Sequence, residues 1–94
     1  MVIVEKVRDE TGLVYRLLID EAGNVEGVVV TTTIQPDDKD WLMRQTGLTN
    51  WVEGDVLGTN DAGQVVREYV LTSPGKSYAY LKAKYRFAIP WARR

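Results

Sequence analysis

Two tyrosines and then three cations occupy every second position from Tyr78 to Arg86, and no other part of the sequence is better suited to binding chemistry. In an extended chain, every second residue lies on one face and successive same-face residues are roughly 6.6 Å apart. That spacing is close to the phosphate repeat of an extended nucleic-acid strand, on which cations track the backbone and aromatic rings stack with bases. A further aromatic residue, Trp91, follows this stretch. The candidate partner-binding residues are therefore Tyr78, Tyr80, Lys82, Lys84, Arg86 and Trp91.

The charge of the chain is divided in the same region. Lys76 to Arg94 contains six basic residues and no acid, whereas residues 1–75 contain six Lys or Arg and thirteen Asp or Glu. Segregated charge produces a field that steers a partner, so the basic segment fits an acidic protein surface or a nucleic-acid strand. The acidic remainder fits a nucleic-acid mimic that occupies the basic groove of an enzyme. The alternative is internal neutralisation by carboxylates on neighbouring elements, namely Glu26, Glu53, Asp55 and Glu68.

The composition excludes several chemistries. The chain has no cysteine and no histidine, so disulfides, thiolate nucleophiles, imidazole bases and histidine-bound metals are all absent from it. The acids of Asp37-Asp38-Lys39-Asp40 are explained by the positive end of a helix dipole. No calcium loop, P-loop or dinucleotide fingerprint is present. We expect a protein without enzymatic activity, catalytic residues, cofactor or metal.

Six strands are expected to position these residues, and each of the first three is bounded by turn residues. Three come first, at Val2–Arg8, Leu13–Asp20 and Val25–Ile34, and three follow, at Asp55–Thr59, Gln64–Thr72 and Ser77–Ile89. Residues 49–54 are predicted to form a loop or a short extended piece that buries Trp51. In the last strand, the face with Leu81 and Tyr85 is expected to point to the core.

One helix is expected between the two groups of strands, from Pro36 to Thr46. Proline suits the first helical position, and acids favour the first turn. Gly47 suits the left-handed residue after the helix. The order βββ-α-βββ indicates an α+β, β-rich single domain spanning residues 1–94. Its sheet is mainly antiparallel, either open or closed into a small partial barrel, with one helix packed on it.

Three turns carry strong signals. Asp20-Glu21-Ala22-Gly23-Asn24 and Asn60-Asp61-Ala62-Gly63-Gln64 both fit a type I turn followed by a left-handed glycine. Ser73-Pro74-Gly75 has the signature of a type II turn. After the last strand, residues 89–94 form a short basic tail.

These observations predict a small non-enzymatic interaction module that binds another macromolecule, most directly a protein. Single-stranded nucleic acid is the alternative, and the acidic mimic comes third. A homodimer is a further option, because Val28-Val29-Val30 is apolar on both faces and belongs either in the middle of a sheet or at a dimer seam. No membrane partner is expected, since no apolar run approaches about 20 residues. Without a signal peptide, a cytoplasmic location is the expectation.

Overall fold

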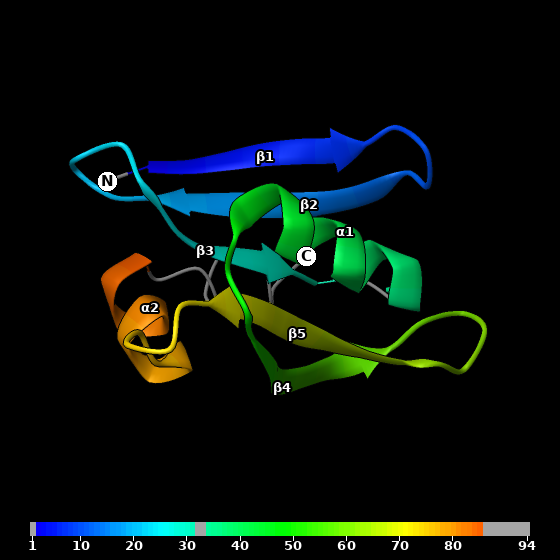
Figure 1. Ribbon diagram of the computed structural model, residues 1–94. Helices are drawn as coiled ribbons and strands as arrows, with labels where there is room; N and C mark the ends of the chain where they lie inside the picture. The colour runs from blue at the N-terminus through cyan, green and yellow to red at the C-terminus, as the bar shows by residue number, and fades with distance from the viewer. Residues whose placement is uncertain (1, 32–33, 86–94) are drawn as a thin grey trace.

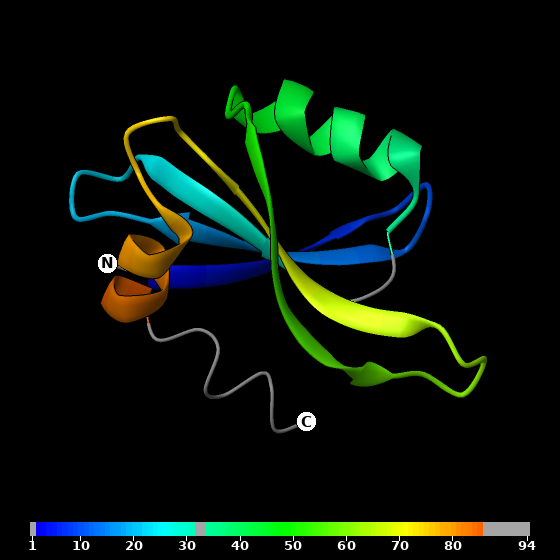
Figure 2. The same cartoon turned by 90° about the horizontal axis from the view of Figure 1, so that it is seen from below.

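A computed structural model describes residues 2–31 and 34–85 and shows a five-stranded antiparallel sheet with a helix on each face (Figures 1 and 2). The elements follow in the order β1 (Val2–Arg8), β2 (Leu13–Ile19), β3 (Val25–Val30), α1 (Pro36–Thr46), β4 (Asn50–Thr59), β5 (Val65–Thr72) and α2 (Tyr78–Tyr85). The strand order is β1-β2-β3-β5-β4, which puts β1 and β4 at the two edges. The predicted α+β, β-rich class is confirmed, and the sheet is open.

The two similar hairpin turns form as predicted. Gly23 and Gly63 have φ angles of 86° and 78°, in the left-handed region that glycine adopts without a steric cost. In each turn the side-chain oxygen of the first residue accepts hydrogen bonds from two backbone N–H groups further along: Asp20 from Ala22 and Asn24, and Asn60 from Ala62 and Gln64. The shared sequence therefore reflects shared turn chemistry.

Helix α1 begins and ends where the sequence predicts. Pro36 occupies the first turn, and Gly47 adopts a φ of 73° while its N–H donates to the Met43 carbonyl at 2.9 Å. Asp38 in the first turn is buried, and its carboxylate accepts hydrogen bonds from Arg8 at 2.9 Å and Thr11 at 2.7 Å. The helix is thereby tied to the end of the β1–β2 hairpin.

The core is divided by the sheet into two layers. On the α1 side, Leu42 and Leu48 pack on Val28, Val30 and Leu71. On the other side, Leu81 and Tyr85 of α2 pack on side chains from three central strands, which are Leu18, Val29 and Val70. Val28, Val29 and Val30 are buried within this one chain, so they belong to a central strand and are not a dimer seam.

The sixth predicted strand is wrong, because residues 78–85 form α2. The side-chain oxygen of Ser77 accepts the Tyr80 N–H at 3.0 Å, and the Ser77 carbonyl accepts the Leu81 N–H at 3.1 Å. Ser77 therefore caps a segment rich in Ala, Leu and Lys, all strong helix formers. The alternation in the sequence came partly from Ala79 and Ala83, which are exposed and fit either pattern. Residues 86–89 of the predicted strand lie outside the described residues.

Strand β4 begins earlier than predicted, at Asn50 instead of Asp55. Residues 50–53 pair continuously with β5, and the Trp51 ring stacks on Tyr69 with 5.4 Å between centroids. Of the two alternatives predicted for residues 49–54, a loop or a short extended piece, the extended one is confirmed for residues 50–54, and Gly54 lies next to a shift in register between Glu53 and Val56. Packing of the half-buried Trp51 against the core offsets the low strand propensity of glycine.

The turn before α2 is correctly placed, but its predicted type is wrong. The Lys76 N–H donates to the Ser73 carbonyl at 3.0 Å, which closes the expected four-residue turn. Gly75 does not have the positive φ that a type II turn requires. Neither of the two helices in the described ranges is long and apolar enough to cross a membrane.

Candidate functional site

The predicted binding residues come together on α2, but they do not form one open face. On a helix, residues four apart are neighbours and residues two apart are not. Lys82 accordingly lies over the Tyr78 ring at 5.2 Å, and Lys84 over the Tyr80 ring at 5.7 Å. The two Tyr–Lys pairs therefore point to different sides of α2. Arg86 and Trp91 lie outside the described residues.

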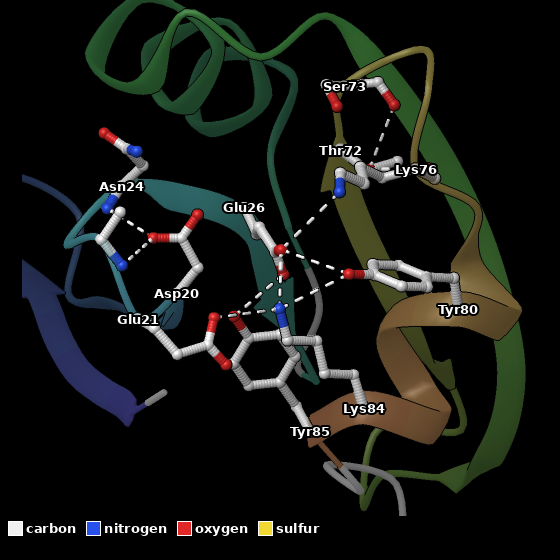
Figure 3. A network of polar contacts seen from close by, with 11 residues as sticks. Asp20, Glu21, Asn24, Glu26, Thr72, Ser73, Lys76, Tyr80, Lys84 and Tyr85 are labelled. Carbon is white, nitrogen blue, oxygen red and sulfur yellow. Dashed lines mark hydrogen bonds and ion pairs between the residues drawn. The ribbon is translucent and has the colours of Figure 1, made fainter.

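Glu26 of β3 is the centre of the first polar cluster that holds α2 (Figure 3). This buried carboxylate accepts hydrogen bonds from Lys84 at 2.9 Å and from the Tyr85 hydroxyl at 2.9 Å. Tyr80 donates at 3.4 Å, and the Lys76 ammonium lies 3.8 Å away. One carboxylate thus collects two lysines and two tyrosines from the turn and helix that follow β5.

The electrostatics of this cluster favour the charged forms of Glu26 and Lys84. Burial alone would raise the pKa of Glu26, but hydrogen bonds from Lys84 and Tyr85 and the nearby lysine charges outweigh it and lower that pKa. The same contact raises the pKa of Lys84. Burial, and then the hydrogen bond to Glu26, raises the pKa of the Tyr85 hydroxyl. The cluster therefore stabilises the protonation states that Glu26, Lys84 and Tyr85 already have at neutral pH, which is typical of a structural role.

A second cluster joins α2 to β4 and β5. The Lys82 ammonium pairs with the Asp55 carboxylate, and the Tyr78 hydroxyl donates to the fully buried carboxylate of Glu68. The close approach of Tyr78 depends on Gly54, since a Cβ built there would lie 2.8 Å from the tyrosine ring. Burial, followed by the hydrogen bond to Glu68, raises the pKa of Tyr78 to about 12.

The lysines of α2 and its preceding turn are therefore neutralised from within the molecule. Lys76, Lys82 and Lys84 all have carboxylate partners in the strands and turns of the preceding chain. Of the four carboxylates that the sequence proposed for this role, Glu26 and Asp55 pair with lysines and Glu68 with a tyrosine. Glu53 instead pairs with Arg67 of the neighbouring strand at 2.7 Å. In the described segment, the basic residues act mainly as attachments for α2.

A groove of about 440 Å³ lies at the opposite end of the sheet, between the β1–β2 hairpin, the start of α1 and Gln64. Its one charged lining residue is Asp38, whose carboxylate is already occupied by Arg8, Thr11 and the Gln35 N–H. The described residues also contain no group of three or more candidate metal ligands. The groove thus offers space, and its charged lining residue is already engaged in hydrogen bonds.

The outer edge of β1 is the remaining candidate, and sequence reasoning did not identify it. β1 pairs with β2 in an unbroken register over seven residues, and no described strand lies on its other side (Figure 1). Its side chains Val2, Ile3 and Val7 are 54%, 39% and 53% exposed. An uncovered strand edge offers unpaired backbone N–H and C=O groups that another chain can use. The signal in the sequence that could have indicated this surface was the set of apolar residues on both sides of Glu5-Lys6. That β1 lies at an edge follows only from the order of the strands in the sheet.

The other edge differs in shape. The register of β4 against β5 shifts twice, between Glu53 and Val56 and between Val56 and Gly58. Such bulges twist an edge and interrupt its row of hydrogen-bonding groups, which is a common protection against strand addition.

Comparison of the chain with protein-family models, with curated proteins and with solved structures found no match.

Proposed function

We propose that this chain is a small non-enzymatic interaction module that binds a protein partner by adding an extended partner segment to the edge of β1. The observation that carries the proposal is the bulge-free edge of β1, which no described strand covers and which exposes Val2, Ile3 and Val7. In strand addition, backbone hydrogen bonds supply affinity and alternating side chains supply selectivity. β1 offers both, because its register with β2 has no bulge and its exposed valines and isoleucine provide apolar contact.

The polar residues of β1 support a role in selective binding. Glu5 and Lys6 interrupt the apolar run at its centre. Charged side chains on an edge strand discourage unspecific pairing, since an arriving strand must match them or bury them unpaired. The edge is therefore neither fully blocked nor indiscriminately adhesive.

The nucleic-acid alternative has less support in this fold. Its candidate cations Lys82 and Lys84 are held by Asp55 and Glu26, so binding a phosphate chain would require these internal pairs to break. The tyrosines that would stack with bases also serve the same attachments, through Glu68 and Glu26. A protein partner at β1 leaves α2 undisturbed.

The test is selection from a displayed library of random ten-residue segments, followed by affinity measurement on the enriched segments. We expect wild-type protein to enrich segments of high strand propensity. Val7→Lys places a charge on the β1 edge and should abolish their binding. Val56→Lys is the matched control, because Val56 is 55% exposed on the opposite edge strand, against 53% for Val7.

Three results would overturn the proposal. One is a library from which no segment is enriched. Another is a set of enriched segments whose affinity for Val7→Lys equals their affinity for wild type. Loss of binding in both valine variants would likewise place the contact elsewhere than on β1.

A further inference from the structure

We infer that the segment accepted by β1 is an antiparallel strand with the order apolar–acidic–basic–apolar–apolar, read from its N-terminus, and that a second copy of this chain is a poor occupant. The inference rests on the proposed function and specifies the partner chemistry. It follows from the faces on which the β1 side chains lie and from the charges they carry.

The register of the sheet assigns each β1 side chain to a face. Ile3, Glu5 and Val7 lie opposite Leu18, Arg16 and Val14 of β2. This is the face covered at one end by α2, since Leu18 packs in the cluster that contains Leu81. Val4 and Lys6 lie on the other face, opposite Leu17 and Tyr15, which belong to the α1 side of the core.

Charge then specifies the two central positions of an added strand. Glu5 pairs with Arg16 at 2.9 Å, yet its side chain remains 56% exposed, so it can also meet a cation on its outer side. Lys6 is exposed and has no ion-pair partner among the described residues. Directly opposite residues of paired strands share a face, and opposite charges there are favourable. A basic residue is therefore preferred opposite Glu5 and an acidic residue opposite Lys6.

The remaining positions call for apolar side chains. Val7, Val4 and Ile3 would face the residues before and after the charged pair. The antiparallel direction matches all four strand pairs of the existing sheet and is slightly the more stable per residue. Read against β1 from Val7 back to Ile3, the preferred segment is apolar, acidic, basic, apolar, apolar.

A second copy contains a similar run, Val4-Glu5-Lys6-Val7, but its geometry prevents it from matching. Two copies that pair antiparallel through the same edge are related by a twofold axis normal to the sheet, so each face continues into the same face of the partner. An odd-numbered residue of one copy can then lie opposite only odd-numbered residues of the other copy, and an even-numbered residue opposite only even-numbered ones. Glu5 therefore meets Glu5, Ile3 or Val7 of the other copy, and never Lys6.

Every such register leaves the central charges mismatched. Pairing centred on Glu5 puts two carboxylates opposite each other, and pairing centred on Lys6 does the same with two ammonium groups. Like charges directly opposite are destabilising in a sheet. A partner strand of different sequence has no such constraint.

The experiment uses two synthetic peptides of identical composition, Thr-Val-Glu-Lys-Val-Ile-Thr and Thr-Val-Lys-Glu-Val-Ile-Thr, titrated into the full chain up to millimolar concentration and followed through the amide NMR signals of β1. We expect the first peptide to bind about tenfold more tightly, because exchanging two residues turns two favourable cross-strand pairs into two unfavourable ones. In Lys6→Glu each peptide has one match and one mismatch, so the preference should fall to about one.

The outcomes separate this inference from the proposed function. Equal binding of both peptides to wild type, or an undiminished preference in Lys6→Glu, overturns the charge pattern. Binding of neither peptide also overturns it, whereas the proposed function then depends on the independent library selection. A dimer in sedimentation that Val7→Lys dissociates would show that a second copy occupies the edge, which contradicts the inference directly.

Discussion

At the scale of single residues, buried carboxylates determine how the last described helix is held. Glu26 and Glu68 are both buried, but their partners differ. Glu26 faces two lysines and two tyrosines, whereas Glu68 has one tyrosine, and its second oxygen has no hydrogen-bond partner within the described residues. A buried charge stabilises a fold only when its partners compensate for lost hydration. Of these two carboxylates, Glu26 is therefore the one on which the stability of α2 should depend.

Substitution of Glu26 by glutamine tests this role. The amide keeps the shape of the carboxylate but removes its charge, and leaves Lys84 and Tyr85 with a weaker acceptor. We expect Glu26→Gln to lower the free energy of unfolding by about 1 to 3 kcal/mol at pH 7, measured by urea denaturation. Glu53→Gln is the control, because the exposed Glu53–Arg67 pair should contribute at most about 1 kcal/mol. Equal losses in the two variants would contradict a special role for Glu26.

The same variant has a defined pH dependence. The pKa of Glu26 is lowered in the folded protein, so its contribution is complete above the ordinary value of 4.5 and is lost as pH falls through the folded value. Protonation removes this contribution from wild type, while glutamine has no such proton to bind. The stability difference between wild type and Glu26→Gln should therefore be constant from neutral pH to about pH 5 and narrow below the ordinary pKa. A stability difference between the two proteins that widens on acidification would contradict a lowered pKa of Glu26.

At the scale of elements, α2 depends on glycines in the strands beneath it. A Cβ on Gly27 would lie 2.9 Å from Leu81, and one on Gly54 would lie 2.8 Å from Tyr78. Both positions also face a backbone carbonyl oxygen, that of Leu71 at 3.3 Å from a Cβ on Gly27 and that of Glu68 at 3.1 Å from one on Gly54, so the contacts at Gly54 are the tighter. Gly54 is thus the position where the strand must lack a side chain for the helix to dock.

Gly54→Ala should therefore displace Tyr78 and loosen α2. We expect a loss of about 1 to 3 kcal/mol in stability, typical of overpacking, together with faster hydrogen exchange at the amides of residues 81–85. Gly75→Ala is the matched control, because no atom lies within 4 Å of the added Cβ and its φ is not in the left-handed region. That change should leave both measurements nearly unaltered. Unchanged exchange in Gly54→Ala would show that Tyr78 does not anchor the helix.

At the scale of the whole molecule, the division of charge in the sequence is partly reversed by folding. The three described lysines of the basic segment form ion pairs with acids of the preceding chain. Lys76 and Lys84 pair with Glu26, and Lys82 pairs with Asp55. The net charge of each segment is therefore a poor guide to the surface field. What the fold leaves open at this scale is the edge of β1, where apolar residues flank Glu5 and Lys6.

The sequence predicted most of this fold because its signals were local. Asp20 and Gly23 specify one hairpin turn, and Pro36 and Gly47 bound α1 through backbone geometry alone. Residues 78–85 were misassigned because the period-2 pattern relied on alanines, while the Ser77 cap was overlooked. The edge position of β1 could not be read from the sequence, since it depends on β5 pairing with β3 and not with β1. Local chemistry specified the elements, and long-range pairing determined which surface remained open.

The open edge leads to a prediction about self-association. Wild-type protein should not associate through β1, because the registers centred on Glu5 and on Lys6 place like charges opposite each other, and no same-edge register pairs Glu5 with Lys6. Replacing Lys6 by valine removes one of these like-charge contacts and extends the apolar run, so Lys6→Val should associate at least severalfold more strongly in sedimentation equilibrium. Arg44→Val is the control, since it removes the same charge from an exposed position on α1. Equal association of the two variants would indicate general stickiness, whereas a selective effect of Lys6→Val would show that the charge on β1 keeps this edge available for a partner of different sequence.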